Sequence, residues 1–298
     1  MPATKVARIQ ASGRLMLMVG TLSCVAIDEV WVATPGGVTR PYDREGRRVT
    51  ELTILAKYCD ALLSVASFED YCPNGIQVEG ERPVRRLASG VTASAALLQE
   101  ALAWGADAIL VHHGWFWRGE DPRLIGMKGR RVRTLTRANV ALLAYHLPLD
   151  AHPELGNNRQ LAEVLELRAP RAADRCGGIL WHGQLPHPMA APDLAVHLAA
   201  ALGRSPLYIQ GRPGMIEHVA WCTGAGQTYI EQAADLGVDA YLSGEISEQT
   251  THQARELGLD YFALGHHASE RYGVRSLGWH LAERFALEHC FFDIENPA

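Results

Sequence analysis

Several features that would assign this sequence to a common class of protein are missing. Its six cysteines are scattered, and no two of them form a Cys-x-x-Cys pair. This argues against a zinc ribbon or a disulfide framework and favours reduced thiols in a cytoplasmic protein. No apolar run reaches the roughly 18 residues of a membrane span. Lys and Arg number 28 against 33 Asp and Glu, so we expect neither a membrane nor a nucleic acid as a partner.

Familiar catalytic signatures are missing as well. The sequence has no Gly-x-Ser-x-Gly elbow and no cysteine beside a plausible base, which argues against nucleophilic catalysis by a side chain. The run Thr223-Gly224-Ala225-Gly226 could cradle an anion, but it lacks the full P-loop or dinucleotide pattern. The arginine-rich residues 128–137 are typical of a solvated helix face, with phosphate contact as the weaker alternative.

The 298 residues are enough for one large domain or two modest lobes. Residues 1–49 carry little information and are expected to be a poorly ordered extension; Met16 or Met18 is an alternative start. Strands alternate with helices over residues 50–167 and again over 217–298, which predicts two α/β lobes with mixed or mostly parallel sheets. Residues 168–216 are richer in Pro, Gly and small residues, and we interpret them as a short connecting segment.

The two predicted lobes echo one another. Gly105-Ala106-Asp107-Ala108 and Gly237-Val238-Asp239-Ala240 each follow a predicted helix and open a strand. In both halves polar residues come directly after the strands. Short repeats can arise by chance, but this one suggests related lobes and a site where they meet.

The first of these strands ends in two adjacent histidines. The apolar run 108–111 indicates a strand buried on both faces, and His112-His113-Gly114 stops it. Adjacent side chains on a strand normally point to opposite faces. At the carboxyl end, where the backbone turns, both histidines can reach one pocket, and open α/β sheets bind their ligands at that end.

Three clusters of potential metal ligands follow predicted strands. They are His112 with His113, His146 with Asp150, and His266 and His267 with Glu270. Imidazole and carboxylate groups bind zinc, iron and manganese, and a bridging carboxylate could hold two ions roughly 3.5–4 Å apart. His266 and Glu270 would face one pocket if a helix begins near Ala268.

Each cluster also has a structural interpretation. A single histidine at a strand end is more often hydrogen-bonded than a metal ligand. Asp150 could cap a helix, and Glu270 could pair with Arg271 or Arg275. Residues 115–117, Trp-Phe-Trp, could stack a nucleobase, with a packed interface or hydrophobic lid as an equal alternative.

Five motifs in order resemble the GTP cyclohydrolase I type 2 homologue family, the Nif-three-like dinuclear metal proteins, and most of all its short bacterial branch. The resemblance covers about residues 51–298. The motifs are Asp70-Tyr71-Cys72-Pro73-Asn74-Gly75, Gly90-Val91-Thr92-Ala93-Ser94, Val111-His112-His113-Gly114, His146-Leu147-Pro148-Leu149-Asp150 and Gly265-His266-His267-Ala268-Ser269-Glu270.

The resemblance implies a ligand set, a fold and an assembly. The implied metal ligands are His112, His113, Asp150, His266 and Glu270, with Glu270 as the candidate bridge, while His146 and His267 would be pocket residues that shuttle protons. The implied fold is two similar α/β lobes with the metal pair between them, in a toroidal homohexamer. The family's longer members have Gly-Asp where this chain has Gly244-Glu245, which leaves the role of Glu245 less certain.

Two functions are consistent with these features. The first is a metal-dependent hydrolase that acts on a small-molecule substrate such as a nucleotide or related heterocycle, and the family name implies a GTP-like ring. The second is a non-catalytic metal-binding or interaction protein whose two divalent ions stabilise a ring-shaped oligomer. A ligand set of histidines and carboxylates without cysteine does not distinguish among zinc, iron and manganese.

Overall fold

The computed structural model describes residues 8–11, 14–17, 30–32, 40–42, 49–174 and 176–298. The chain divides into two compact units, Met1–Thr50 and Glu51–Ala298. In the first unit, β1 (Arg8–Ala11) pairs antiparallel with β2 (Arg14–Leu17), and β3 (Val30–Val32) pairs antiparallel with β4 (Arg40–Tyr42). The prediction of a poorly ordered extension over residues 1–49 lies largely outside the described residues.

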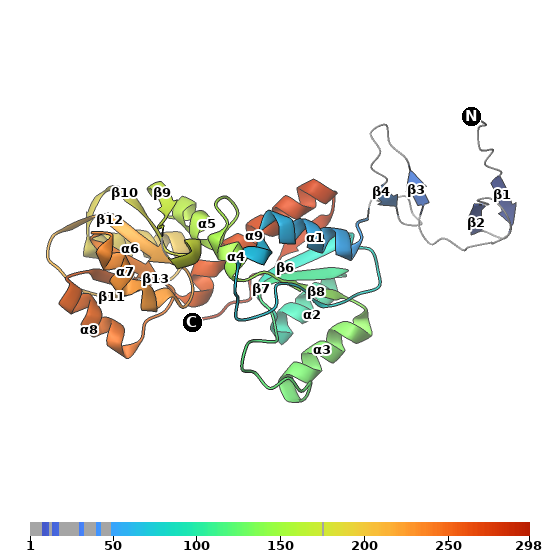
Figure 1. Ribbon diagram of the computed structural model, residues 1–298, viewed down its shortest axis with the longest axis horizontal. Helices are drawn as coiled ribbons and strands as arrows, with labels where there is room; N and C mark the ends of the chain where they lie inside the picture. The colour runs from blue at the N-terminus through green and yellow to red at the C-terminus, as the bar shows by residue number, and fades with distance from the viewer. Residues whose placement is uncertain (1–7, 12–13, 18–29, 33–39, 43–48, 175) are drawn as a thin grey trace. The chain divides into compact units, whose positions relative to one another are not determined.

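The second unit contains a five-stranded sheet in the order β15-β6-β7-β8-β5. Its three central strands, β6, β7 and β8, are labelled in Figure 1. Its strands are β5 (Gly75–Val78), β6 (Arg86–Thr92), β7 (Ala108–His113), β8 (Ala141–Ala144) and β15 (Glu288–Phe291). The edge strand β5 is antiparallel to β8, and the other four strands are parallel. The sheet is therefore mixed, as predicted.

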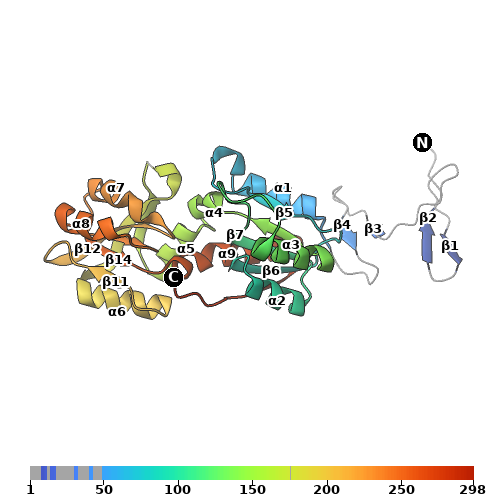
Figure 2. The same ribbon diagram turned by 90° about the horizontal axis from the view of Figure 1, so that it is seen from below.

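Helices cover both faces of this sheet, as Figures 1 and 2 show. One face packs against α1 (Leu52–Leu62) and α9 (His266–Phe285), and the other against α2 (Ala95–Trp104) and α3 (Gly126–Ala138). A short helix, η1 (Val65–Ser67), follows α1. On β7, Leu110 packs in the hydrophobic core beneath α1 and α9, and Ile109 packs in the core beneath α2 and α3. The strand is therefore buried on both faces, as its apolar run predicts.

A six-stranded mixed sheet follows, in the order β11-β14-β13-β12-β10-β9. Strands β12, β13 and β14 are parallel, and β9, β10 and β11 run antiparallel to their neighbours. Its strands are β9 (Arg168–Ala172), β10 (Trp181–Ala190), β11 (Leu207–Ile209), β12 (Met215–Cys222), β13 (Ala240–Ser243) and β14 (Asp260–Ala263).

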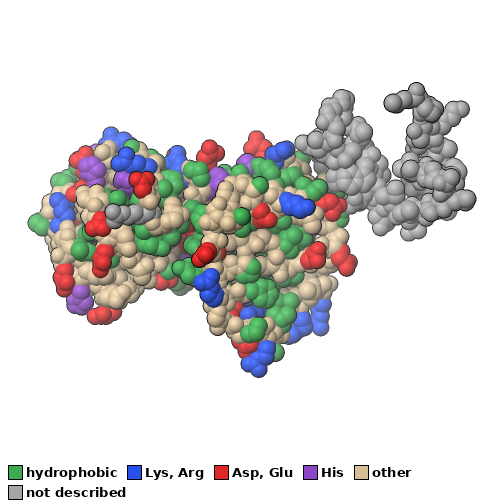
Figure 3. Space-filling view, viewed as in Figure 1, with side chains coloured by type: hydrophobic (Ala, Val, Ile, Leu, Met, Phe, Trp, Pro, Cys, Tyr) green, Lys and Arg blue, Asp and Glu red, His purple; other side chains and the backbone are tan. Residues whose placement is uncertain are grey.

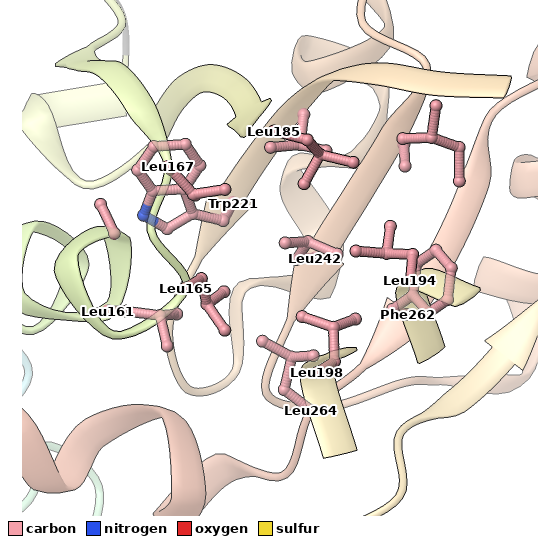
Figure 4. Close-up of a cluster of buried hydrophobic side chains, with 14 of the residues drawn as sticks. Leu161, Leu165, Leu167, Leu185, Leu194, Leu198, Trp221, Leu242, Phe262 and Leu264 are labelled. Carbon is pink, nitrogen blue, oxygen red and sulfur yellow. The ribbon is translucent and has the colours of Figure 1, made fainter. Parts of the chain in front are cut away.

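This second sheet also lies between two layers of helices. In Figure 4, Leu194 and Leu198 of α6 (Ala191–Leu202) lie against Leu242 of β13 and Phe262 of β14. The helix α5 (Asn157–Val164) closes the same core. The opposite face packs on α7 (Ile230–Asp235) and α8 (Glu248–Leu257). The remaining short helices are α4 (Leu147–Ala151), η2 (Cys176–Gly178) and η3 (Gly226–Tyr229).

The internal echo has a physical counterpart in the two sheets. Asp107 Oδ2 accepts hydrogen bonds from the backbone N–H groups of Arg85 and Arg86 at 3.0 and 2.9 Å. Asp239 Oδ2 accepts from the N–H groups of Glu217 and His218, both at 2.9 Å. Each aspartate therefore fixes the backbone of the preceding parallel strand, at the start of β6 in one sheet and at the third and fourth residues of β12 in the other. Matched roles of this kind support the interpretation of two related lobes.

The chain crosses between the sheets in a way that local patterns do not reveal. Residues 168–216, expected as a connection, supply β9, β10, α6 and β11 to the second sheet. The last strand, β15, returns to the first sheet and pairs in parallel with β6. The helix α9 lies between β14 and β15 in the sequence, and it packs Val274, Leu277 and Leu281 into the core of the first sheet. Hydrophobic periodicity predicts that these elements exist, but not which sheet they join.

The surface carries charges of both signs. On the face drawn in Figure 3, acidic and basic side chains are interspersed over both lobes. Within the described part of the chain, no helix is both long and apolar enough to span a bilayer.

Candidate metal centre

The two adjacent histidines at the end of β7 lie side by side. Their ring centroids are 4.6 Å apart, and His112 is fully buried. Each Nδ1 has a hydrogen-bond partner: Tyr145 O lies 2.9 Å from that of His112, and Thr92 Oγ1 lies 3.1 Å from that of His113. Both Nε2 atoms are therefore directed toward a common centre, as the strand-end geometry predicts.

Asp150 reaches the same centre from α4, a helix that the sequence analysis does not predict. Its Oδ1 lies 3.4 Å from His112 Nε2. Asn157, at the first turn of α5, donates to the same oxygen at 2.8 Å and accepts from Gly273 N at 2.7 Å. Asp150 lies within α4, and Gly156 is the residue that precedes α5, so the alternative of a helix-capping Asp150 does not describe this site.

The third group comes from the first turn of α9. The helix begins at His266, slightly earlier than predicted, and places His266 and Glu270 one turn apart with Nε2 and Oε2 at 2.9 Å. Glu270 pairs with histidines, whereas Arg271 pairs with Asp293. Gly265 precedes the helix at φ +98°, and a Cβ there would come within 2.1 Å of Arg204 Nη1. The backbone conformation and the close contact with Arg204 therefore favour glycine at the residue before α9.

Glu270 is shared by two sets of potential ligands. One set is His113, His266 and Glu270, and the other is His112, Asp150 and Glu270. Glu270 Oε2 lies 3.0 Å from His113 Nε2, while Oε1 lies 3.6 Å from His112 Nε2. Although Oε2 is buried, it has no hydrogen bond of acceptable geometry. An orphaned carboxylate oxygen among converging imidazole nitrogens is what a metal-ligand set requires, so these residues fit a divalent ion.

The outer nitrogens of the other two histidines are held by carboxylates. His266 Nδ1 lies 2.7 Å from Glu245 Oε1, and His146 Nδ1 lies 2.7 Å from Asp70 Oδ1. With His112 and His113, four histidines thus have a partner at Nδ1 and turn Nε2 inward. Partners of this kind fix the tautomer and ring orientation of metal-binding histidines.

The loop after β12 lies directly against Glu270. Gly224 has φ +63°, and a Cβ at this position would lie 1.9 Å from Glu270 Oε1. Its N–H donates to Ser269 Oγ at 3.0 Å. The run Thr223-Gly224-Ala225-Gly226 therefore does pack against an anion, and that anion is a carboxylate of the chain itself.

Burial and charge act together on the ionisable groups. Burial lowers the pKa of His112, but Asp150 and Glu270 outweigh it and raise the pKa to about 9. Burial lowers the pKa of His113 to about 4, against the opposing effect of Glu270. Burial raises the pKa of Glu270, yet His113 and His112 hold it well below its usual range. Glu270 is therefore an ionised carboxylate in a buried site, which suits it to a cation.

A cavity of about 630 Å³ opens onto these groups. Its wall includes Thr92 and His113 of the first sheet, and Cys222 of the second sheet with Thr223 directly after it. The two predicted proton-shuttle residues, His146 and His267, also line it. The volume lies in the range of pockets for small molecules.

The three aromatic residues after His113 have different roles. Trp115 is buried and donates from Nε1 to Ala93 O at 2.9 Å, so it is a core residue. Phe116 packs partly buried in the same cluster. Trp117 lines the cavity, with its ring 5.0 Å from that of His146 in an edge-to-face arrangement. Only Trp117 among the three can contact a ligand there.

The structure brings together all five residues predicted as ligands, and adds others. Asp70 and Asn157 were not singled out as site residues. Asp70 lies in a turn that the sequence marks clearly, so its position before Asn74-Gly75 was an available signal. Asn157 has none, because its contact with Asp150 depends on how α4 and α5 fold together. Glu245, left uncertain by the sequence, contacts His266.

Comparisons with known proteins match almost the whole of the second unit, and they agree on its family. Residues 50–297 match the family Duf34/NIF3 (NGG1p interacting factor 3). The "GTP cyclohydrolase 1 type 2 homolog" of Allochromatium vinosum is 60% identical over 250 residues, covering 84% of this chain and 98% of that protein. A solved structure described as "Structural genomics, protein ybgI, unknown function" has a TM-score of 0.81 at 48% identity, covering 84% of this chain and 100% of that one. The solved structure of TTHA1606 from Thermus thermophilus has a TM-score of 0.75 at 35% identity, covering 83% and 99%.

Proposed function

Because this chain belongs to the Duf34/NIF3 family, we propose that it binds two divalent metal ions and uses them as a metal-dependent hydrolase. The observation that carries the proposal is the pair of ligand sets that share Glu270. One ion would be held by His113, His266 and Glu270, and the other by His112, Asp150 and Glu270. The metal is zinc, iron or manganese, because the ligands are imidazoles and carboxylates without a thiolate.

The surrounding residues have roles suited to hydrolysis. Divalent ions held there would supply Lewis acidity and a nucleophilic water near neutral pH. His146 and His267 line the cavity beside the ligands and can accept or return a proton during the reaction. Asn157 and Glu245 hold Asp150 and His266 in place through hydrogen bonds.

We propose a nucleotide or related heterocycle as the substrate. The relatives are named as homologues of a GTP cyclohydrolase, which acts on a purine nucleotide. Trp117 lines the cavity and offers an indole face or edge against which a planar ring can pack. The cavity volume of about 630 Å³ accommodates a ligand of this size.

Two measurements test this proposal. His112→Ala/His113→Ala should abolish bound metal in elemental analysis, whereas His187→Ala/His252→Ala, which changes two histidines outside the site, should keep it. Metal-loaded native protein should then hydrolyse at least one member of a panel of nucleotides and cyclic phosphoesters. A full metal complement in the first variant would refute the ligand assignment, and absence of turnover would refute the hydrolase.

A non-catalytic role is the second candidate, and one observation favours it. Asp150, His112 and His113 belong to the first lobe, while Glu270 and His266 begin the helix that follows β14 of the second sheet. Ions at this point would connect the two lobes mechanically. In that case chelation should lower the melting temperature sharply, and the ions should have no exchangeable water in their coordination shell.

The scattered cysteines support a proposal about location, and the family resemblance supports one about assembly. We propose a cytoplasmic homohexamer. Light scattering on the eluting protein tests the assembly, and a mass of one or two chains would refute it.

A further inference from the structure

Over the residues that the structure describes, the cavity beside the ligands lacks the side chains that usually bind a chain of phosphates. None of the described residues that line it is a lysine or an arginine. The basic groups on this wall are four histidines, each within 3.0 Å of a carboxylate oxygen: His113, His146, His266 and His267. Asp150 and Glu270 line the cavity as well. Because proteins bind phosphates chiefly with arginine and lysine, a polyphosphate here would face carboxylates without a matching cation.

Two arginines contact residues of the wall, and both are held by backbone carbonyl groups. Arg204 Nη1 donates to the carbonyl oxygens of residues 297 and 298 at 2.9 and 3.3 Å. Arg118 Nη2 donates to Asp70 O at 2.8 Å, and its guanidinium lies 5.8 Å from the ring centroid of Tyr71. Both guanidinium groups therefore bind the chain itself, and neither residue lines the cavity.

Two backbone features that could replace a cation are occupied as well. In the glycine-rich run 223–226, the N–H groups of Thr223 and Gly224 each donate to a side-chain oxygen at 3.0 Å. At the start of α9, His267 N donates to Ala298 O at 3.2 Å. Glycine-rich loops and helix N-termini bind phosphate through free N–H groups, and these N–H groups already have acceptors within the chain.

Aromatic rings and uncharged polar groups also line the cavity. On the first lobe, Trp117 and Tyr71 lie with their ring centroids 5.0 and 6.4 Å from that of His146. Thr228 and Tyr229, in η3, belong to the second lobe. Burial raises the pKa of Tyr229 to about 12, so its hydroxyl is uncharged near neutral pH. A planar heterocycle can stack on such rings while hydroxyl groups bind its polar edge.

We propose that the cavity takes a planar heterocycle with at most one anionic group, such as a nucleobase, a nucleoside or a nucleoside monophosphate, and discriminates against nucleoside triphosphates. This rests on the proposed hydrolase and names its substrate class. The ring lies among Trp117, Tyr71 and Tyr229. One anionic group can be accommodated at the ligand sets, because two carboxylate ligands would not neutralise two divalent ions.

Equilibrium dialysis with the full-length, Zn²⁺-loaded protein tests the substrate class without requiring turnover. The probes are guanosine, adenosine, cytidine and uridine, each with its monophosphate and its triphosphate, in excess Mg²⁺ so that the triphosphates do not extract Zn²⁺. In at least one series the nucleoside and the monophosphate should bind. The triphosphate should bind roughly tenfold or more weakly than the monophosphate, because its additional charges meet the carboxylates of the wall.

Trp117→Ala places the ring in the cavity. It should weaken binding of the nucleoside by roughly 5- to 150-fold, the usual contribution of stacking on one aromatic side chain. Trp279→Ala is the matched control, because Trp279 is an exposed residue of α9 that packs on His289 and does not line the cavity. It should bind the nucleoside as native protein does.

Thr228→Arg supplies the missing cation. The triphosphate should then bind at least as tightly as the monophosphate, whereas the uncharged Thr228→Gln should keep the native order. If folded Thr228→Arg also keeps the native order, the inference is overturned, because a missing cation would not explain the discrimination.

The native protein decides the matter even if no variant folds. A triphosphate that binds as tightly as its monophosphate overturns the inference, as does absence of binding by every nucleoside and monophosphate. Native-like binding of the nucleoside to folded Trp117→Ala overturns the placement of the ring. Failure of the proposed hydrolase is a separate result, because it would show as absence of turnover while the dialysis comparison still decides which class of ligand the cavity takes.

Discussion

Glu270 is the residue on which the candidate site depends most. It is 3% exposed, and its two oxygens face different histidines, His112 from Oε1 and His113 and His266 from Oε2. Removing one partner of a buried charged group leaves the other without compensation, at a cost of several kcal/mol. The position of this carboxylate therefore matters as much as its presence.

Gly224→Ala should displace Glu270 and release metal. A methyl group there would lie 1.9 Å from Glu270 Oε1, in addition to the strain of φ +63°. Gly237→Ala is the matched control, because Gly237 has φ +69° and open space around its Cβ position. Gly237→Ala should lose ~1 kcal/mol of stability in urea unfolding through backbone strain alone, and Gly224→Ala should lose more because Glu270 is displaced as well. Only Gly224→Ala should lose metal in elemental analysis.

Equal metal content in Gly224→Ala and Gly237→Ala would contradict this prediction. It would mean that Glu270 can move aside without loss of either ligand set.

Residue types at strand ends predicted candidate ligands but not the residues that hold them in place. Imidazole and carboxylate groups after strands whose carboxyl ends meet indicated three clusters, and the family resemblance implied that His112, His113, Asp150, His266 and Glu270 among them are the ligands. Asn157 was missed because an amide with no motif around it carries no chemical signal. Asp70 was part of a recognised turn, yet only the fold shows that it reaches His146, which is 76 residues further along the chain.

At the scale of elements, α9 connects the site to the core of the first sheet. Its first two turns carry His266 and Glu270, and its third turn passes close to α5 at Gly273. A Cβ at Gly273 would lie 2.6 Å from Asn157 Oδ1. This is the same oxygen that accepts from Gly273 N, and the amide nitrogen of Asn157 holds Asp150.

Gly273→Ala should therefore weaken metal binding although Gly273 touches no ligand. Displacing Asn157 removes a hydrogen bond to Asp150, and loss of such an outer partner typically costs 10- to 100-fold in metal affinity. Titration with Zn²⁺ in a competing chelator measures the change.

Gly278→Ala is the control on the same helix. Its added methyl would lie 2.2 Å from His289 Nε2, far along α9 from the ligands. Overpacking should destabilise it by about 1–3 kcal/mol while its Zn²⁺ affinity stays native. Equal loss of affinity in both variants would show that general loosening of α9, not Asn157, controls the site.

Helices and strands were predictable from periodicity, and their partners were not. The sequence indicates α9 and β15 as a helix and a strand, but alternation alone would place both with the second lobe. Pairing of β15 with β6 depends on contacts between residues that are far apart in the sequence, such as Glu288 with Arg86, which no local pattern encodes. The helix α4 was not predicted, because a five-residue segment that contains a proline is too short to show helical periodicity.

The stability of the whole second unit should depend on pH through His289 on β15. Ser89 Oγ lies 2.7 Å from its Nε2, and burial lowers the pKa of this histidine to about 4 from its usual 6.5. The folded state holds the ring neutral while the unfolded chain protonates it below pH 6.5. Stability from this group is therefore complete above pH 6.5 and is lost as the pH falls toward 4.

His289→Gln should flatten this dependence. Urea midpoints of native protein should fall more between about pH 7 and pH 4.5 than those of His289→Gln, while His252→Gln, an exposed helix position, should follow the native curve. A native-like fall in His289→Gln would assign the acid sensitivity to other groups.

The return of β15 to the first sheet has a consequence for synthesis on the ribosome. The first sheet lacks the strand beside β6, and one of the two helices on the face that α1 and α9 cover, until α9 and β15 have been translated. A nascent chain released before α9 would expose the apolar face that carries Leu87 and Leu110, with an unpaired strand edge beside it. Such a fragment should need chaperones, and a ribosome that stalls late in this message should yield an aggregate, not a folded first lobe.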